Sequence, residues 1–584
     1  MKNGKLKFNF NIKKRLLPVI LLSVCLPLIL FVAIPFEVYA NNMDEFLFSL
    51  SSFFPLCVLF GLLFAAAIAC SILFLPEKAY RITYALVLAL SFMFFFQGTF
   101  LNFGLDSLAG DNMSSSPVHI GLQVLDAFIW LAVFGAAIAF AVIKDKKGIF
   151  AIIAVILSVV VIATQIITPI SSTVKHPDVF LSRYARILKE QPDYKDKVVT
   201  NENLTTVSGG RNIFYFCIDR FDEVFAEAAY EKDPGIFDGL DGFTWFKDNL
   251  SLYGHTFPSV AYMLTENKFD IELRRKENLD AAYADNNTLS LLAENGYKVN
   301  LFTSPYYAYN TAHSLPDYIS NVSDTTEFKT TNPMKLMGCM IGTAAYRCMP
   351  LFFKSLIYGI ESATFNECVS SKAENGYGNY TTGNGTVYDL VSESAFEEKG
   401  DKNFSFVHVD GCHNISLGHL TNNVSAIQKS MITSSVSISF DIINEYLQAL
   451  KDKGLYENAT IIITGDHPDP GNNNGAPEKP KLTALFFKPS GSAGEELVQS
   501  YAPVEHKNIW PTIFQSENIE RDNKGVETLY DIAEADPTHE RTHIYNTYQS
   551  SQCELYTFKI TGAGTDFDNW ELVHTDYLDH FIMD

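Results

Sequence analysis

The chain has 584 residues, of which 47% are hydrophobic and 19% are charged, and its formal net charge is −22. This length predicts more than one domain, and the composition is too apolar for a disordered chain. The first 170 residues contain 11 Lys and Arg and 8 Asp and Glu, so the remainder contains 33 and 58 and carries a net charge of −25. Because this second part is so acidic, we do not expect it to bind nucleic acid or an anionic membrane surface by general electrostatic attraction.

Five apolar stretches in the first part are each long enough to cross a hydrocarbon core about 30 Å thick, which takes roughly 20 helical residues. They are Leu16–Phe36, Phe53–Leu75, Ile82–Phe103, Leu122–Ile143 and Gly148–Ile167. We therefore expect a five-helix, multi-pass transmembrane domain over residues 1–170.

The charges of the loops between these stretches predict the orientation of the chain. Basic residues precede the first stretch and occupy the second and fourth connections, at Lys78, Arg81 and residues 144–147, whereas the first and third connections carry acidic residues only. Because loops rich in Lys and Arg stay on the cytoplasmic side, the N-terminus is predicted to be cytoplasmic. Everything after Ile170 is then predicted to lie outside the cell membrane.

Three features leave alternatives open. The first stretch could be a cleaved signal peptide ending near Val38–Ala40, which leaves the large domain on the same side. Asp126 lies near one end of the fourth stretch, where it could be a functional acid or a structural residue that reaches the interface. Outside the apolar stretches, a disulfide among Cys339, Cys348 and Cys368 would suit an oxidising compartment, but the sequence does not assign it.

The second part alternates short apolar runs with helical patterns. Residues 171–210 are polar and predict a linker with a juxtamembrane helix. Buried strands are predicted at 213–218, 297–302, 404–409, 460–463 and 482–487, and helices at 288–295 and 432–451. This alternation predicts an α/β domain with a mostly parallel sheet over residues 211–540. Short antiparallel strands, such as 553–561 and 570–574, predict a C-terminal β subdomain over 541–584.

The segment Met334–Ile360 departs from this alternation because it is rich in methionine and other apolar residues. It is either a buried pair of helices in a subdomain or an apolar surface that lies against the bilayer near a lipid substrate. The sequence leaves both interpretations open.

Polar residues with metal-ligand character follow three of the predicted strands. Asp219 follows the first strand, His408 and His413 surround a later one, and the pair Asp466–His467 follows another. Ligand groups collect beyond the carboxyl ends of parallel strands. A turn can direct a neighbouring carboxylate and imidazole at one ion, and hard oxygens with imidazole suit Mn²⁺, Mg²⁺ or Zn²⁺. By itself, the pair could also be an ordinary polar turn.

Thr256 is the candidate nucleophile. It precedes a predicted helix, Pro258–Leu264, and the N-terminus of a helix favours negative charge such as that of a phosphate group. The alternative is that Thr256 only caps the helix. As a nucleophile its hydroxyl needs activation, which coordination to a cation provides by lowering the hydroxyl pKa.

Together these residues resemble the alkaline phosphatase/sulfatase superfamily, and within it the lipoteichoic acid synthase and phosphoglycerol transferase branch. The resemblance covers about Ile213 to Phe514 and rests on residues 213–219, 256–265, 408–413, 465–467 and 509–514. Five spans followed by an outer catalytic domain are also the layout of that branch. The resemblance implies that residues 211–540 form an alkaline-phosphatase-like (sulfatase) catalytic domain.

The resemblance also implies a metal centre. Asp219, Thr256, Asp466 and His467 match the ligands of the family, and Thr256 matches the nucleophile. The implied cofactor is a divalent metal ion, Mn²⁺ before Mg²⁺ or Zn²⁺. Asp222 is an alternative first ligand, but it lies a turn beyond the end of the predicted strand, so we favour Asp219.

Three histidines are candidates for substrate binding. His413 matches a substrate-binding histidine of the family, while His408 and His255 are further candidates with a structural role as the alternative. The chain departs from the family pattern at Pro468, where many relatives have Gly, and the arginine that some relatives use on the phosphate has no match. These departures concern the identity of the substrate more than the core chemistry.

The implied reaction is transfer of a phosphoglycerol group from a phospholipid donor to a cell-envelope glycan or polymer acceptor, through a covalent phosphothreonine. Sulfatases of the superfamily instead need a formylglycine made from Cys or Ser, which Thr256 cannot become, so sulfate ester hydrolysis is disfavoured. The alternatives are a phosphoethanolamine transferase, a phosphodiesterase or phosphatase, or, from a different class, a non-catalytic envelope sensor or scaffold.

Overall fold

The computed structural model describes residues 12–43, 46–102, 120–142, 149–192, 194–284, 287–305, 307–354, 365, 368–413, 426–471, 475–523, 525–547 and 553–578. It divides into two compact units. The first comprises Met1–Tyr194 with Glu327–Ser370, and the second comprises Lys195–Thr326 with Ser371–Asp584. The basic residues 2–11 and 144–147, on which part of the predicted orientation rests, lie outside the described residues.

The first unit contains five helical segments that are long and apolar enough to cross a membrane, as predicted. The first segment is α1 (Ile12–Pro27), the π-helix η1 (Leu28–Ala33) and α2 (Ile34–Asn41); the others are α3 (Phe54–Leu73), α4 (Glu77–Phe100), α5 (Ile120–Val142) and α6 (Ile149–Lys175). Helices satisfy their own backbone groups, which hydrocarbon requires. The π-helix begins directly after Pro27, because proline has no N–H to continue the regular ladder.

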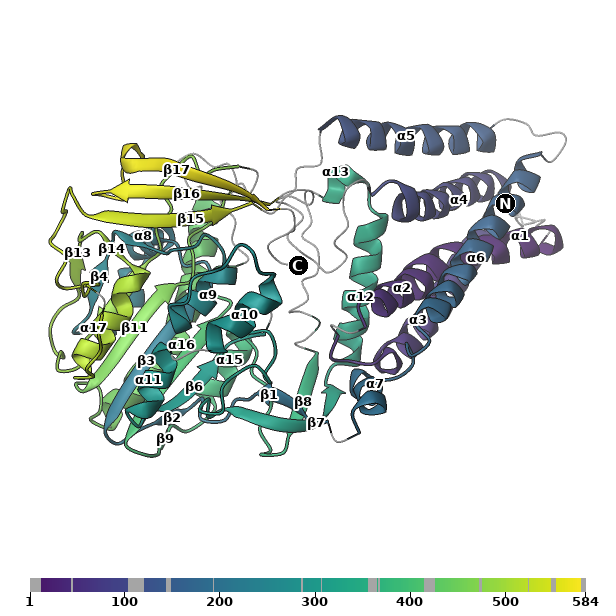
Figure 1. The fold of residues 1–584 in the computed structure, drawn as a ribbon. Coiled ribbons are helices and arrows are strands. Elements are labelled where there is room, and N and C mark those ends of the chain that lie inside the picture. Colours follow the sequence, from purple (N-terminus) through teal and green to yellow (C-terminus); the bar gives the residue numbers. More distant parts are fainter. Residues whose placement is uncertain are drawn as a thin grey trace, which may run out of the picture. The chain divides into compact units, whose positions relative to one another are not determined.

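The first unit also contains an insertion from the second half of the sequence. It forms α12 (Pro333–Cys348) and α13 (Leu351–Lys354). Figure 1 shows α12 beside α2, α3 and α4, and its buried residues Leu336, Met337 and Met340 belong to the same apolar cluster as residues of the first span. Of the methionine-rich segment, residues 355–360 lie outside the described residues. Shorter helices of this unit are η2 (Leu50–Ser52) and α7 (Arg183–Glu190).

The second unit is built on a seven-stranded sheet, which confirms the predicted α/β fold. Its strand order is β13–β4–β12–β11–β3–β10–β6. The bounds are β3 (Arg211–Ile218), β4 (Thr244–Phe246), β6 (Lys298–Phe302), β10 (Lys402–Val409), β11 (Ala459–Gly465), β12 (Leu485–Lys488) and β13 (Val498–Ser500). Only β12 runs antiparallel to its neighbours among these described strands.

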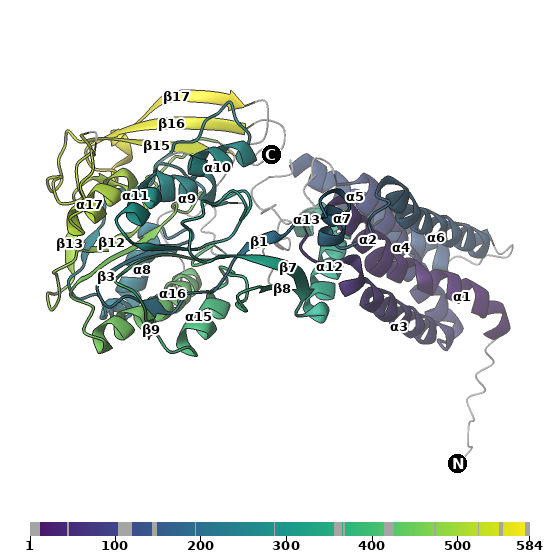
Figure 2. The same cartoon turned by 60° about the horizontal axis from the view of Figure 1, so that its bottom comes forward.

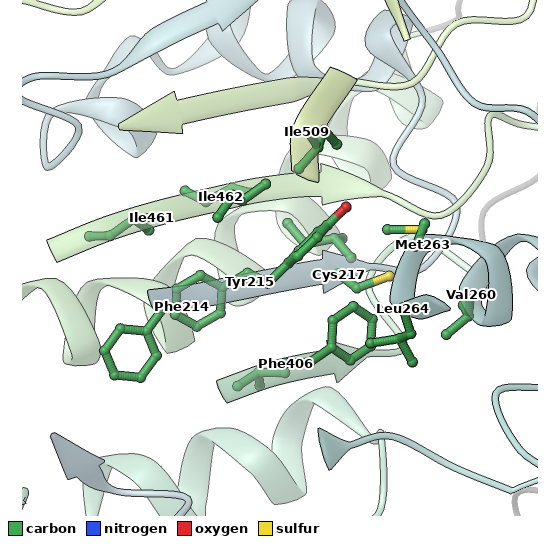
Figure 3. Packing of buried hydrophobic residues seen from close by; sticks show 14 of the residues in the cluster. Phe214, Tyr215, Cys217, Val260, Met263, Leu264, Phe406, Ile461, Ile462 and Ile509 are labelled. Carbon is green, nitrogen blue, oxygen red and sulfur yellow. The ribbon is translucent and has the colours of Figure 1, made fainter. Parts of the chain in front are cut away.

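Helices cover both faces of this sheet. Figure 2 shows α8 (Glu223–Lys232), α15 (Asn384–Ser392) and α16 (Ala426–Asp452) on one face, and α9 (Thr256–Thr265), α10 (Arg275–Ala284), α11 (Thr288–Glu294) and α17 (Ile509–Ser516) on the other. The strands are therefore buried on both faces, which explains their continuous apolar sequence. Figure 3 shows this core, with Tyr215 of β3 between Phe406 of β10 and Ile462 of β11, and Met263 of α9 near the strand ends.

The register of the three central strands brings their carboxyl ends level. Ile218, the last residue of β3, is opposite Val409 in β10 and Gly465 in β11. The residues that come next in each strand therefore leave the sheet at one edge. The order of the strands alone would not reveal this alignment, because a slip of one residue would turn every side chain to the other face.

The C-terminal segment forms the predicted small antiparallel sheet of β15 (Glu540–Asn546), β16 (Cys553–Thr561) and β17 (Trp570–Leu578). It is joined to the chain before α9, since Ile544 donates its N–H to the carbonyl of Leu252 at 2.7 Å. The other strands form small sheets: β1 (Asp196–Val199) with β7 (Val322–Thr330) and β8 (Val369–Ala373), β2 (Thr206–Val207) with β9 (Glu397–Glu398), and β5 (Asn249–Leu250) with β14 (Val504–Glu505).

The disulfide considered among Cys339, Cys348 and Cys368 is not formed. All nine cysteines are thiols in the structure, and these three are buried. The apolar packing of α12 accounts for their burial without a covalent bond, as is common for cysteine in a core.

Candidate metal centre and active site

The candidate site lies at the edge of the sheet where the neighbouring parallel strands β11, β3, β10 and β6 end. β11 contributes Asp466 and His467, β3 contributes Asp219, and β10 contributes His408 near its end. α9 brings Thr256 to the same place, where its Oγ lies 3.2 Å from Nε2 of His467. The structure thus brings together all four residues that the sequence predicts as metal ligands.

The turn after β11 fixes the carboxylate of Asp466. A Cβ atom at Gly465 would lie 2.6 Å from the carbonyl oxygen of Phe221, so this close approach requires glycine. Oδ1 of Asp466 accepts from the backbone N–H of Arg220 at 2.8 Å and from that of His467 at 2.9 Å. Its Oδ2 is buried and has no hydrogen-bond partner among the described residues. One oxygen is therefore held in place and the other is left for a ligand.

The backbone also fixes the orientation of His467. Nδ1 lies 2.6 Å from the carbonyl oxygen of Pro468, and a carbonyl only accepts, so Nδ1 carries the proton. Nε2 then points toward Thr256, 3.6 Å from Oδ2 of Asp466 and 3.7 Å from Oδ1 of Asp219. A backbone carbonyl that orients one ring nitrogen while the other faces carboxylate and hydroxyl oxygens is the arrangement typical of a metal-ligating histidine.

Thr256 does not serve as the helix cap that the sequence left as an alternative. The N-cap of α9 is His255, whose backbone is extended, and Phe257 departs from helical angles with φ −97° and ψ 127°. The helix is tied to the metal-ligand turn, because the hydroxyl of Ser259 donates to the carbonyl of Asp466 at 2.5 Å. The hydroxyl of Thr256 is therefore aimed at the site by the irregular first turn of α9.

Histidines surround the carboxylate of Asp219. Nδ1 of His413 lies 3.2 Å from both oxygens of Asp219, and Nε2 of His408 lies 3.8 Å from Oδ2. Burial opposes ionisation, but the imidazole of His413, whose Nδ1 faces both oxygens, holds the pKa of Asp219 below its usual range. Burial raises the pKa of the neighbouring Asp466. Two adjacent buried carboxylates with opposite shifts are typical of a functional site.

His408 has the geometry of a metal ligand in addition to those predicted. Single ligand atoms of Asp219, His408 and Asp466 lie within 4.8 Å of one another. Nδ1 of His408 lies 3.0 Å from Oγ1 of Thr303, at the end of β6, whereas Nε2 is buried without a partner among the described residues. From the sequence, His408 is predicted only as a substrate-binding candidate.

The donor set therefore fits a divalent cation. The unpartnered Oδ2 of Asp466, the unpartnered Nε2 of His408 and the lone pair of His467 converge with Asp219 and Thr256. Three of these groups are oxygen donors and two are imidazoles, which suits Mn²⁺, Mg²⁺ or Zn²⁺.

Asp222, the alternative ligand, accepts hydrogen bonds from the backbone through both carboxylate oxygens. One oxygen accepts from the N–H of Val224 at 2.8 Å and caps α8, and the other accepts from the N–H of Asp469 at 2.9 Å. Burial raises its pKa to about 6. Both oxygens have backbone partners, so the structure favours Asp219 as the carboxylate that follows β3.

The two remaining histidines differ in accessibility. The side chain of His413 is 30% exposed. His255 is buried, and its Nδ1 lies 3.0 Å from Oδ1 of Asn546, the last residue of β15. The C-terminal sheet thus supports the N-cap of α9, and His413 is the imidazole of the site with access to solvent.

The sequence analysis missed a buried charged group next to the site. The guanidinium of Arg220 donates to Asp469 and, at 2.9 Å, to the carbonyl of His413, while Lys481 donates to the carbonyl of Asp469 at 2.5 Å. Arg220 has φ +59°, an uncommon left-handed conformation that aims its N–H at Asp466. The sequence shows that Arg220 follows Asp219 directly, but no local sequence pattern predicts its left-handed backbone conformation.

No family model matches the chain, and no curated protein matches it in sequence. Solved structures that resemble it are members of the alkaline phosphatase/sulfatase superfamily. One is a protein of the alkaline phosphatase superfamily from Vibrio parahaemolyticus (10% identity, covering 65% of this chain and 85% of the other, TM-score 0.35). Another is the lipoteichoic acid synthase LtaP from Listeria monocytogenes, with 11% identity over 61% of this chain and 85% of the other, and a TM-score of 0.32. A third is Ps i-CgsB in complex with a neocarrahexaose, with 12% identity over 64% of this chain and 86% of the other, and a TM-score of 0.37.

Proposed function

We propose that this chain is a membrane-anchored, metal-dependent transferase that moves a phosphoglycerol group from a phospholipid to a cell-envelope glycan or polymer. The observation that carries the proposal is the position of Thr256, whose Oγ lies 3.2 Å from a histidine nitrogen among unpartnered buried ligand atoms. A hydroxyl in such a place is a nucleophile for phosphorus.

The cation would be held by Asp219, Asp466, His467 and Thr256, with His408 as a fifth ligand. When bound, it would lower the pKa of the Thr256 hydroxyl and neutralise charge on the phosphoryl oxygens. The chain itself orients the ligands through the backbone contacts of Asp466 and His467 described above.

The reaction has two displacement steps at phosphorus. In the first, Oγ of Thr256 forms a bond to phosphorus and the bond from phosphorus to the diacylglycerol oxygen breaks, leaving a phosphothreonine diester. In the second, an acceptor hydroxyl forms the bond to phosphorus and the bond to Oγ breaks. Oγ of Thr256 would enter the first step without its proton, which passes to solvent as the hydroxyl pKa falls, and would leave the second step in the same state. His413, the solvent-accessible imidazole, gives a proton to the departing diacylglycerol oxygen and takes one from the acceptor hydroxyl, so the protons balance.

Anchoring in a membrane favours a phospholipid as the donor of the transferred group. The five apolar helices hold the chain at a bilayer, where the concentration of phospholipid head groups is high. We further propose that the N-terminus is cytoplasmic and that the α/β unit acts outside the cell membrane, as the loop charges predict.

The test uses the full chain in lipid nanodiscs with Mn²⁺ and a panel of head-group-labelled phospholipids. We expect label from phosphatidylglycerol to reach an added glycan or polymer acceptor as diacylglycerol is released. Preferred use of phosphatidylethanolamine would keep the mechanism and change the donor. Release of labelled head group to water alone would indicate a phosphodiesterase or phosphatase. A metal-loaded, folded chain that turns over no donor would contradict enzymatic function and favour a sensor or scaffold.

A further inference from the structure

Residues 333–354 make polar contacts with the ends of three different membrane helices. Nη1 of Arg347 pairs with Oε2 of Glu37 at 3.0 Å, and its Nε donates to the carbonyl of Gly98 at 3.0 Å. Farther along the insertion, the N–H of Leu351 donates to Oδ2 of Asp126 at 2.8 Å. Glu37 lies near the end of the first span, Gly98 near the end of α4 and Asp126 near the start of α5. These contacts gather one end of the helix bundle around the insertion.

A lysine completes this polar group. Nζ of Lys354 donates to Oδ1 of Asn102 and, at 3.0 Å, to the carbonyl of Arg347, whose oxygen also accepts from Nδ2 of Asn102 at 3.1 Å. The two cations and the two carboxylates, Glu37 and Asp126, balance in charge, so the group is suited to the edge of a hydrocarbon core.

Apolar side chains of the same insertion remain exposed on the first unit. Met334 is 50% exposed at the start of α12, and Phe352 and Phe353 of α13 are 52% and 50% exposed. α13 packs against α5, as Figure 1 shows, and α5 itself exposes large apolar side chains such as Phe128 and Leu131. The exposed phenylalanines thus belong to a short helix that packs against an apolar spanning helix with exposed apolar side chains of its own.

We propose that residues 333–354 are embedded in the bilayer together with the five spans, and that Phe352 and Phe353 contact phospholipid acyl chains. The opposite face of α12 packs on α2, α3 and α4, so the insertion lies beside helices whose remaining surface requires hydrocarbon. Transfer of exposed phenylalanines beside such a surface from water into hydrocarbon lowers the free energy. Asp126 is then structural, because it accepts from the first N–H of α13.

The proposal rests on the membrane anchoring in the proposed function but not on the catalytic reaction. It identifies an element of the later sequence as part of the membrane domain. Since the chain passes between the two units at residues 194–195, 326–327 and 370–371, the α/β unit would be attached to the membrane by three covalent connections instead of one.

Photo-crosslinking of the full chain in phospholipid nanodiscs tests this directly. Benzoylphenylalanine replaces Phe352 or Phe353, and adducts with lipid are detected by mass spectrometry. Phe60, exposed on α3, is the control for contact with lipid, and Tyr501, which is 54% exposed in the α/β unit, is the control for contact with water. We expect lipid adducts at 352 and 353 in yields comparable with position 60, and none at 501.

Adducts at 60 with none at 352 and 353 would overturn the proposal while leaving the membrane anchor intact. Crosslinks from 352 or 353 to another protein chain, in place of lipid, would overturn it as well and indicate a protein interface. Loss of adducts at all positions, including 60, would contradict the membrane anchor itself. Because none of these readouts needs turnover, failure of the proposed reaction is distinguished from failure of this proposal.

Discussion

The two units contain two buried polar clusters that differ in how far their polar atoms converge. In the first unit, each charged group around Arg347 has an ion-pair or hydrogen-bond partner, and Oδ1 of Asp126 is a single buried atom without one in the described part of the chain. In the second, Asp219 and Asp466 face imidazole nitrogens, and two buried ligand atoms have no partner among the described residues. Buried polar groups that pair with one another stabilise a fold. Several buried polar atoms that converge without such partners are instead typical of a binding site for an ion or another ligand. The first cluster therefore has the features of a structural contact, and the second has those of a possible metal site.

The largest effect should follow removal of the nucleophile. Thr256→Ala should lower head-group transfer by at least about a thousandfold, because the covalent step has no other hydroxyl in reach of His467 among the described contacts. Thr256→Ser, which keeps the hydroxyl, should retain part of the activity. Initial rates in nanodiscs measure both. Full activity in the alanine variant would remove Thr256 from the mechanism.

Much of the catalytic site was predictable because its residues follow apolar runs. The strands β3, β10 and β11 are buried on both faces, so their sequences are recognisable as apolar runs, and the polar residues at their ends are the candidate site residues. The rule that parallel strands end together places Asp219, Asp466 and His467 at one edge of the sheet, and the resemblance gave them the role of metal ligands. The resemblance identified Thr256 as the nucleophile. Helix propensity does not predict the irregular first turn of α9, in which Thr256 lies.

Other features depended on contacts far apart in sequence. The left-handed backbone of Arg220 is stabilised by Asp466 and Asp469, 246 and 249 residues away. Likewise, α12 packs on helices that precede it by more than 200 residues, so its apolar pattern was compatible with a soluble subdomain. Periodicity shows that a surface is buried but does not identify its partner.

Metal binding should stabilise the second unit. Mn²⁺ at about a hundred times its Kd should raise the free energy of unfolding by about 2.7 kcal/mol, and a chelator should reverse this. His408→Ala should weaken the stabilisation, whereas His255→Ala, a neighbouring histidine that is bonded to Asn546, should leave it unchanged. Thermal unfolding at graded Mn²⁺ concentrations measures the effect. An equal response of both variants would remove His408 from the ligand set.

Breaking the polar cluster of the first unit should cost stability without affecting metal binding. Arg347→Ala leaves the carboxylate of Glu37 without its cation, and we expect a loss of about 2 kcal/mol for this partly buried pair. Exchange of the two charges, Glu37→Arg with Arg347→Glu, should recover part of it. The unfolding midpoint in nanodiscs reports both effects. A charge exchange no more stable than the single variant would argue against the pair.

A pair of buried histidines in the second unit gives the smallest effect. Burial lowers the pKa of His506 to about 3 and that of His543 to about 4. The unfolded chain binds these protons near pH 6.5, so stability is complete above that pH and falls as the pH drops toward the folded pKa values. Between pH 6.5 and 5.5, His543→Asn should lose about 1 kcal/mol less than the parent chain, because the unfolded imidazole is already half protonated at pH 6.5. Equal pH dependence of the two chains would show that His543 is not the group responsible.

The most direct test of the account is a search for the covalent intermediate. The full chain, loaded with Mn²⁺ and mixed with labelled phosphatidylglycerol without acceptor, is quenched in acid and digested, and the peptides are mapped by mass spectrometry. The account predicts a glycerophosphate adduct on Thr256 that disappears when an acceptor or a chelator is added. A labelled product formed with Thr256 unmodified at every time point, or an adduct on another residue, would contradict it.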